Sequence, residues 1–226
     1  MQFVSTRGAT PPTSLSAALA AGLAPDGGLF VPAQLPHLPP ESFDADDTLA
    51  AVAARLLRPF FSGDALDPEL EAICAHAFDF DAPLRALHDR VFLLELFHGP
   101  TAAFKDFGAR YLAASLARIP RADPRDLTIL VATSGDTGAA VGGAFHRLPG
   151  VRVLILYPDG RVSPRQAHQL GACGDNVRAL RVAGSFDDCQ ALAKRALNDV
   201  RLHQTVPLSS ANSISLGRLL PQISYY

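Results

Sequence analysis

Lys105 is the residue of this sequence whose surroundings most suggest catalysis. It follows the turn segment 98–101 (His-Gly-Pro-Thr) and lies between Phe104 and Phe107. We expect a helix to begin here, which would place the lysine at the positive end of a helix dipole. That dipole and desolvation by the phenyl rings both favour the uncharged amine, the form that Schiff-base chemistry requires. Position alone is also compatible with a surface lysine whose aliphatic stem lies along the two rings.

A glycine-rich segment, Thr133-Ser134-Gly135-Asp136-Thr137-Gly138, follows an apolar run and precedes a helical pattern. Its glycines allow a tight turn, and its hydroxyl and N–H groups at a helix start suit an anion. A dinucleotide site is less well supported, because the first glycine of G-x-G-x-x-G is absent and the downstream acid, Asp159, follows a proline. The other alternative is that the segment only caps the following helix and that its glycines serve close packing. The missing G-K-[ST] excludes a Walker A loop.

A third polar segment, Ser209-Ser210-Ala211-Asn212-Ser213-Ile214-Ser215-Leu216-Gly217-Arg218, follows a predicted strand and opens a helical pattern. Asn and Ser donors with a planar Arg suit a phosphate group. The alternative is that Asn212 or Ser213 caps the helix and that Arg218 faces solvent. The chain has eighteen Arg and only one lysine besides Lys105. This residue, Lys194, lies on a predicted helix among Ala and Arg, and we interpret it as a surface residue.

Strand and helix patterns alternate from residue 91 onward. Short apolar runs predict strands at 91–97, 127–133, 151–157, 177–182 and 206–210. Helical spacing and start signals predict helices at 105–117, 139–147, 163–171, 185–198 and 214–226. Because the apolar runs are continuous, we expect strands that are covered on both faces. The alternation therefore predicts an α/β fold with a parallel sheet flanked by helices.

The first ninety residues follow a different pattern. They are expected to be mostly helical, with helices at 47–61 and 68–78, the second capped by Asp67. Residues 91–226 then form the α/β region, in which a smaller βαβ unit covers about residues 125–211. The last helical pattern stops at Tyr225-Tyr226 without a capping signal, so we expect either a helix end docked in a core or an interrupted chain.

Composition narrows the class of protein. The chain has 226 residues, 48% of them hydrophobic, and a formal net charge of −2, which indicates a globular protein and argues against nucleic-acid binding. No apolar run is long enough to span a membrane, and residues 1–7 show no secretory signal. Cys74, Cys173 and Cys189 are far apart. We expect them to be small buried residues in a reducing cytoplasm, with no disulfide framework and no metal site.

The chemical segments, taken in order along the chain, resemble the threonine synthase family. Residues 93–101 and 104–108 resemble its cofactor-lysine segment, and residues 133–141 resemble its substrate loop. Further matches are Gly27-Gly28-Leu29-Phe30-Val31-Pro32, Ser163-Pro164, Ser210-Ala211-Asn212-Ser213-Ile214 and Pro221-Gln222-Ile223. The family consists of pyridoxal-phosphate enzymes with a tryptophan-synthase-β-like architecture of fold type II. The resemblance is collinear over the whole chain, which has about half the length of a family member.

The resemblance implies that Lys105 holds pyridoxal 5'-phosphate as a Schiff base and then moves protons at Cα and Cβ of O-phospho-L-homoserine. Phosphate would leave by γ-elimination and water would add at Cβ, which gives L-threonine. Ser134, Gly135 and Asp136 would hold the substrate carboxylate and border the 3′-oxygen of the cofactor. The substrate phosphate would be bound by Thr133, Thr137, Asn212 and Arg218. Neither a nucleic acid nor a membrane is an expected partner, and the oligomeric state stays open.

The sequence departs from the family pattern at two places. Ser215 stands where the family usually has a second Asn, and its shorter side chain would weaken or rearrange phosphate binding. The family's second glycine-rich loop, which cradles the cofactor phosphate, lies beyond residue 226. We therefore expect the 226-residue chain alone to be inactive. A truncated fragment that acts at most in folding or interaction, and another pyridoxal-phosphate lyase of fold type II, are the alternatives.

Overall fold

A four-stranded parallel sheet organises the second half of the chain. The computed structural model describes residues 1–44, 46–121 and 123–226. In the sheet the strand order is β7-β6-β5-β8, and each neighbouring pair is parallel. The strands are β5 (Leu127–Ala132), β6 (Val151–Pro158), β7 (Val177–Val182) and β8 (Leu208–Ser210). The predicted α/β class with a helix-flanked parallel sheet is confirmed.

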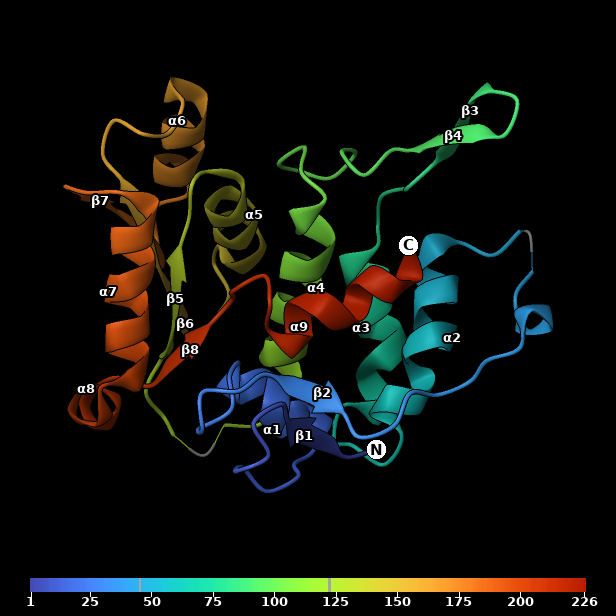
Figure 1. The fold of residues 1–226 in the computed structure, drawn as a ribbon, viewed down its shortest axis with the longest axis horizontal. Helices are drawn as coiled ribbons and strands as arrows, with labels where there is room; N and C mark the ends of the chain where they lie inside the picture. Colours follow the sequence, from blue (N-terminus) through green and yellow to red (C-terminus); the bar gives the residue numbers. More distant parts are fainter. Residues whose placement is uncertain (45, 122) are drawn as a thin grey trace.

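Helices cover both faces of this sheet (Figure 1). α7 (Phe186–Asn198) packs against β5, β6 and β8 on one face. On the other face lie α5 (Asp136–Phe145) and α6 (Pro164–Ala172), which contact β6 and β7 respectively. α4 (Lys105–Arg118) packs against α5, so the helix that carries Lys105 is supported by the sheet layer.

Two of the helices start at capping boxes. The Ser163 hydroxyl accepts a hydrogen bond from the Gln166 N–H, and the Ser163 N–H donates to Gln166 Oε1. Ser185 and Asp188 form the same reciprocal pair at the start of α7. Each box satisfies N–H groups that a helix start would otherwise leave free. The predicted starts of both helices are therefore confirmed.

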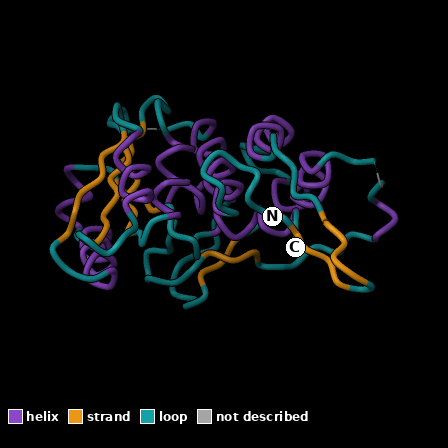
Figure 2. Tube along the Cα trace, turned by 90° about the horizontal axis from the view of Figure 1, so that it is seen from above, coloured by secondary structure: helices purple, strands orange, loops and turns teal. Residues whose placement is uncertain are grey.

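Residues 1–44 and 46–78 form a part on the other side of α4 in which helices are the main regular elements. Its elements are β1 (Phe3–Ser5), α1 (Leu15–Ala21), β2 (Phe30–Pro32), α2 (Leu49–Phe61), α3 (Leu70–Ala77) and the 3-10 turns η1 (Pro40–Ser42) and η2 (Asp67–Glu69). From above, the parallel strands gather at one end of the molecule, away from these helices (Figure 2). Phe61, Tyr111 and Phe145 are fully buried in one continuous hydrophobic core, which joins the two parts through α4.

A β-hairpin of β3 (Leu84–His88) and β4 (Val91–Leu94) projects from the molecule (Figure 1). The strand expected at 91–97 is therefore shorter, and the expectation that it is covered on both faces is wrong. Leu84 is 61% exposed and Phe92 is 54% exposed. The reason is that, within the described residues, β4 pairs only with β3 and does not join the parallel sheet.

The last segment differs from the expected helix at 214–226. α9 (Leu216–Leu219) covers one turn and is followed by the 3-10 helix η3 (Leu220–Ser224). Pro221 lacks an N–H group, so the α-helical hydrogen-bonding pattern cannot continue through it. The end of the segment is nevertheless docked, because the Tyr225 ring lies 4.8 Å from that of Phe107.

Three smaller expectations also need correction. Asp67 is not the N-cap of α3, because it begins the turn η2 and its carboxylate accepts a hydrogen bond from Gly63. A further helix, α8 (Val200–Thr205), follows α7 after a cap at Asp199. Cys74 and Cys189 are buried, but Cys173 is only partly covered. Within the described ranges, no helix combines the length and the apolarity that crossing a membrane would require.

Candidate active site

Lys105 is the first residue of α4, as the sequence predicts. Its Nζ lies 3.5 Å from Asp136 Oδ2 and 4.4 Å from the centroid of the Phe104 ring. The lysine side chain is 21% exposed. A carboxylate and an aromatic face both attract an ammonium group, and so they oppose the positive dipole of the helix start. These contacts hold the amine between the N-terminal ends of α4 and α5.

The buried carboxylate of Asp106 fixes the turn that precedes Lys105. Thr101 donates to it twice, from its N–H at 2.9 Å and from its hydroxyl at 2.6 Å. Asp106 is only 2% exposed and lies in the first turn of α4, where a negative charge is favourable. Gly99 packs directly on this carboxylate. The role of Asp106 was not among the sequence-based expectations, although an acid in the first turn of a predicted helix is a recognisable signal.

The glycine-rich turn is held from inside by Thr133. Its hydroxyl oxygen accepts hydrogen bonds from the N–H groups of Gly135 at 3.0 Å and Gly138 at 2.9 Å, and the residue is 1% exposed. α5 therefore begins at Asp136, three residues earlier than expected. Gly135 has φ of 142°, a conformation that favours glycine, and a Cβ there would collide with Gln166. The N–H groups of Gly135 and Gly138 are thus occupied, while the Thr133 hydroxyl keeps its own proton to donate.

Gln166 connects this turn to α6. Its Nε2 donates to Asp136 Oδ1 at 2.9 Å, while its Oε1 accepts from the Ser163 N–H. The second carboxylate oxygen of Asp136 remains directed at Lys105. Three helix starts are therefore linked through one carboxylate. The capping pattern of Ser163 and Gln166 is visible in the sequence, but the contact with Asp136 depends on how α5 and α6 pack.

A pocket of about 140 Å³ opens at the carboxyl ends of β5 and β8, and we call it the strand-end pocket. Its polar lining comes from the glycine-rich turn, from the segment after β8 and from α7. These polar residues are Thr133, Ser134, Thr137, Gln190, Lys194, Ser210, Asn212 and Ser213. The structure thus brings the second and third chemical segments of the sequence together. Lys105 is outside the lining, but its ion pair joins it to Asp136 of the glycine-rich turn.

Asn212 is oriented by an Asx turn. Its Oδ1 accepts a hydrogen bond from the Ile214 N–H at 3.2 Å and one from the Ser213 hydroxyl at 3.4 Å. The N-cap of α9 is Ser215, so the alternative that Asn212 or Ser213 caps this helix is wrong. The Asx turn leaves the Asn212 Nδ2 N–H groups for a ligand. Ser215 is 2% exposed, and its hydroxyl has no hydrogen-bond partner in the described part of the chain.

Arg218 lies outside the lining of the strand-end pocket. It is 3% exposed, and its Nη1 donates to the Ala211 carbonyl at 2.9 Å. Burial lowers the pKa of Arg218 to about 10, an effect that Tyr225 and Asp106 partly oppose. The alternative that Arg218 faces solvent is therefore wrong. Its role as a phosphate ligand stays a prediction.

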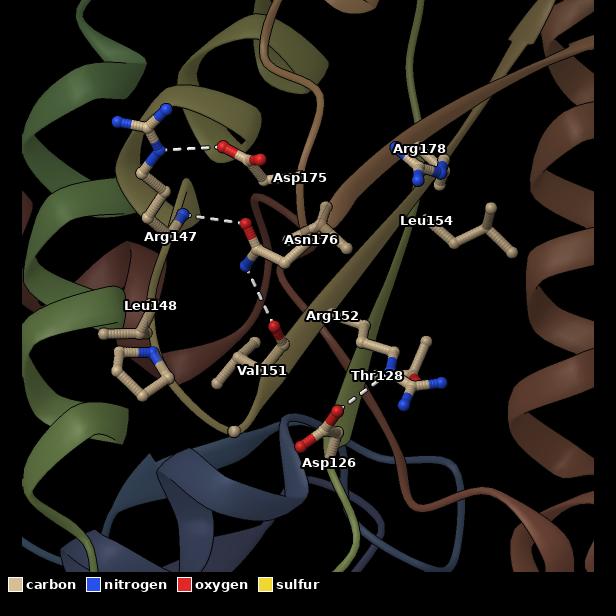
Figure 3. A pocket seen from close by; sticks show the side chains of 13 residues that line it. Asp126, Thr128, Arg147, Leu148, Val151, Arg152, Leu154, Asp175, Asn176 and Arg178 are labelled. Atoms are coloured by element: carbon tan, nitrogen blue, oxygen red, sulfur yellow. Dashed lines mark hydrogen bonds and ion pairs between the residues drawn. The ribbon is translucent and has the colours of Figure 1, made fainter.

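A larger cavity, of about 630 Å³, lies at the opposite end of the sheet (Figure 3). Four of its five charged side chains are paired: Arg147 Nε lies 2.7 Å from Asp175, and Arg152 Nε lies 2.9 Å from Asp126. Ligands of parallel α/β sheets bind outside the carboxyl ends of the strands. The smaller strand-end pocket is therefore the candidate site, because it lies at the carboxyl ends of the strands and has unpaired polar groups.

Comparison with known proteins agrees with this fold. The chain belongs to the pyridoxal-phosphate dependent enzyme family, whose model matches residues 79–215. Within this class, residues 2–78 match the family described as the threonine synthase N terminus. The resemblance to threonine synthase, the fold-type-II architecture and the cofactor class expected from the sequence are confirmed.

Individual relatives give the extent of the similarity. Threonine synthase from Haemophilus influenzae is 44% identical over 213 residues, which cover 94% of this chain and 50% of that protein. The crystal structure of pyridoxal-phosphate-bound threonine synthase from Brucella melitensis superposes with a TM-score of 0.90 at 40% identity, over 100% of this chain and 50% of that one. Threonine synthase from Escherichia coli gives 0.90 at 42% identity, over 100% and 53%. The chain therefore spans about half the length of the relatives it matches.

The residues of the site fit this cofactor. Pyridoxal phosphate carries an aldehyde, and the partly exposed primary amine of Lys105 is the nucleophile that an aldehyde needs. Ser134 and Thr137 line the strand-end pocket with hydroxyl groups, and Asp136, which lies between them in the sequence, faces this amine. The donor set thus suits an aldehyde together with an anionic substrate.

Proposed function

We propose that this chain supplies the N-terminal half of a threonine synthase, which converts O-phospho-L-homoserine and water into L-threonine and phosphate. The observation that carries the proposal is the placement of Lys105, 3.5 Å from Asp136 of the turn whose neighbouring residues line the strand-end pocket. Similarity to threonine synthases over the whole chain supports the choice of reaction. The activity would belong to threonine biosynthesis in the cytoplasm.

Lys105 is the proposed catalytic residue. Pyridoxal phosphate, when bound through this amine, supplies an electron sink for negative charge that develops on the substrate. The Lys105 amine then moves protons at Cα and Cβ of the substrate, which γ-elimination and the addition of water both require. Asp136 orients the amine from the start of α5, and Gln166 in turn holds Asp136.

The anionic groups of the substrate are assigned to the polar lining. Ser134 is exposed at the pocket mouth, where its hydroxyl is available to the substrate carboxylate. Thr137 and Asn212 face the same pocket and are the proposed ligands of the substrate phosphate. Thr133 contributes its one remaining hydroxyl proton, because its oxygen already holds the turn.

Replacement of Lys105 tests the proposal in the protein expressed from its complete reading frame. Lys105→Ala should abolish both threonine formation from O-phospho-L-homoserine and the near-visible absorbance of bound pyridoxal phosphate. Lys105→Arg is the matched control, because it keeps the charge and the pairing with Asp136 but cannot attack an aldehyde. It should be equally inactive, yet as stable to heat as the wild type. Threonine formation by Lys105→Ala would contradict the assignment.

A further inference from the structure

We propose that Lys194 is the cation that binds the substrate phosphate in the strand-end pocket. The inference rests on the proposed function, because it takes a phosphate ester as the substrate. Lys194 is exposed, as expected from the sequence, and the proposal assigns a ligand to this surface lysine. Three observations support it: the face of α7 on which the lysine lies, the charge of the pocket, and the placement of Arg218.

One face of α7 forms a wall of the strand-end pocket. The residues of this helix that line the pocket are Phe186, Gln190, Ala193, Lys194 and Leu197. Their spacing is that of a single helix face. Ala193 is buried against the sheet, so its neighbour Lys194 lies at the edge where this face meets the pocket. Its long, flexible stem lets the ammonium group reach a ligand there.

The strand-end pocket has one cation and no acid in its lining. Among its lining residues, Lys194 is the sole charged side chain. Within the described residues, no carboxylate lies within 4.0 Å of Lys194 Nζ. The other lysine, Lys105, already has such a partner in Asp136. Lys194 therefore gives the pocket a positive charge that the protein itself does not neutralise.

The neutral donors and the size of the pocket agree with a phosphate group. Thr137, Ser213 and the Asn212 amide lie around the same space as Lys194. A pocket of about 140 Å³ is smaller than the roughly 300–1,000 Å³ of whole-ligand pockets, so it suits one end of a ligand. A compact ammonium with hydroxyl and amide donors is a common way to bind phosphate.

Arg218 is not placed to supply this charge. Its guanidinium is buried, bound to the Ala211 carbonyl, and outside the pocket lining. That contact instead supports the strand end from which Asn212 projects. Within the described residues, the charge that lines this pocket therefore comes from α7.

Three substitutions test this proposal in the protein expressed from its complete reading frame and loaded with cofactor. Lys194→Met removes the charge but keeps the length of the side chain. Lys194→Arg restores a cation. Arg195→Met removes the same charge from the adjacent position, which does not line the pocket. The measurements are kcat and KM for O-phospho-L-homoserine, the inhibition constants of inorganic phosphate and of L-homoserine, and the dissociation constant of pyridoxal phosphate.

We expect Lys194→Met to raise KM and the inhibition constant of inorganic phosphate by about 10- to 100-fold, the effect of losing a charge-assisted hydrogen bond. KM should change more than kcat. Binding of L-homoserine, which lacks the phosphate, and of pyridoxal phosphate should stay unchanged. Lys194→Arg should recover most of the affinity, and Arg195→Met should match the wild type.

Several results would overturn the inference. One is a KM of Lys194→Met equal to that of Arg195→Met. Another is an equally weakened binding of L-homoserine, which would place Lys194 at the substrate carboxylate. A third is a loss of affinity for pyridoxal phosphate alone. A wild-type protein that makes no threonine would instead contradict the proposed function. An unchanged KM in an active Lys194→Met protein would contradict only this inference.

Discussion

Asp136 Oδ2 lies 3.5 Å from Lys105 Nζ, so the first residues of two neighbouring helices form an ion pair. Both helix starts are positive ends of dipoles, and the carboxylate is favourable at either of them. Because Gln166 of α6 holds the other oxygen of Asp136, the lysine is positioned by the sheet layer as well as by α4. Its geometry therefore depends on three helices that are distant in sequence.

Asp136→Asn should reduce kcat/KM for O-phospho-L-homoserine by about 10-fold or more, equivalent to about 1.4 kcal/mol of transition-state stabilisation. Asparagine keeps the shape and an oxygen for Gln166, but it cannot pair with the Lys105 ammonium. Steady-state kinetics with a thermal melt would check this. Asp126→Asn is the matched control, since it breaks an ion pair with Arg152 at the far end of the sheet. Equal activities of the two variants would remove Asp136 from the proposed mechanism.

Gly99→Ala should destabilise the protein by about 1–3 kcal/mol, because an added Cβ would lie 2.6 Å from Asp106 Oδ2 and 2.7 Å from Phe80 Cζ. The Asp106 carboxylate is buried and bound to Thr101, so it has little freedom to move. The free energy of unfolding in urea measures the effect. Gly171→Ala is the control: it lies in α6 with nothing within 4 Å of the added carbon, and it should leave stability equal or improve it slightly. An equal loss of unfolding free energy at both positions would show that the close packing at Gly99 does not limit the size of the side chain there.

Asp26 should make stability depend on pH in the acid range. The Ser5 hydroxyl and the Gly28 N–H hold its pKa at about 2, against about 3.9 in an unfolded chain. The folded state thus favours the ionised carboxylate, and this contribution is present above about pH 4 and is lost as the pH falls toward 2. The difference in melting temperature between wild type and Asp26→Asn should be constant from pH 5 to 7 and shrink between about pH 4 and 2. Asp81→Asn, at an exposed position, should show no such trend. A difference that stays constant down to pH 2 would show that Asp26 does not carry the effect.

Those features that depend on local sequence could be predicted well. The capping boxes at Ser163 and Ser185 mark α6 and α7 because their hydrogen bonds span only three residues. The parallel sheet is predicted because its central strands are continuous apolar runs. The interruption of the last helix at Pro221 also has a local signal, but the apolar spacing from residue 214 onward favours one continuous helix and so masks it.

Features that depend on packing could not be predicted. Lys194 and Arg195 are adjacent on one helix, and only the contact of α7 with β5 and β8 decides which of them meets the pocket. The apolar run at 91–97 looks like a buried strand, yet β4 is exposed because, in the described part of the chain, its sheet partner is only β3. The role of Gln166 likewise comes from the juxtaposition of the glycine-rich turn with α6.

The contact between the Phe107 and Tyr225 rings has a consequence for the newly made protein. The helix that carries Lys105 is packed against α9 and η3, which are synthesised roughly a hundred residues later. Because synthesis proceeds at about 5–20 residues per second, α4 is made on the order of ten seconds before these partners. During that interval one apolar side of the helix is without its cover. Until then, this side of α4 is open to aggregation and to chaperone binding.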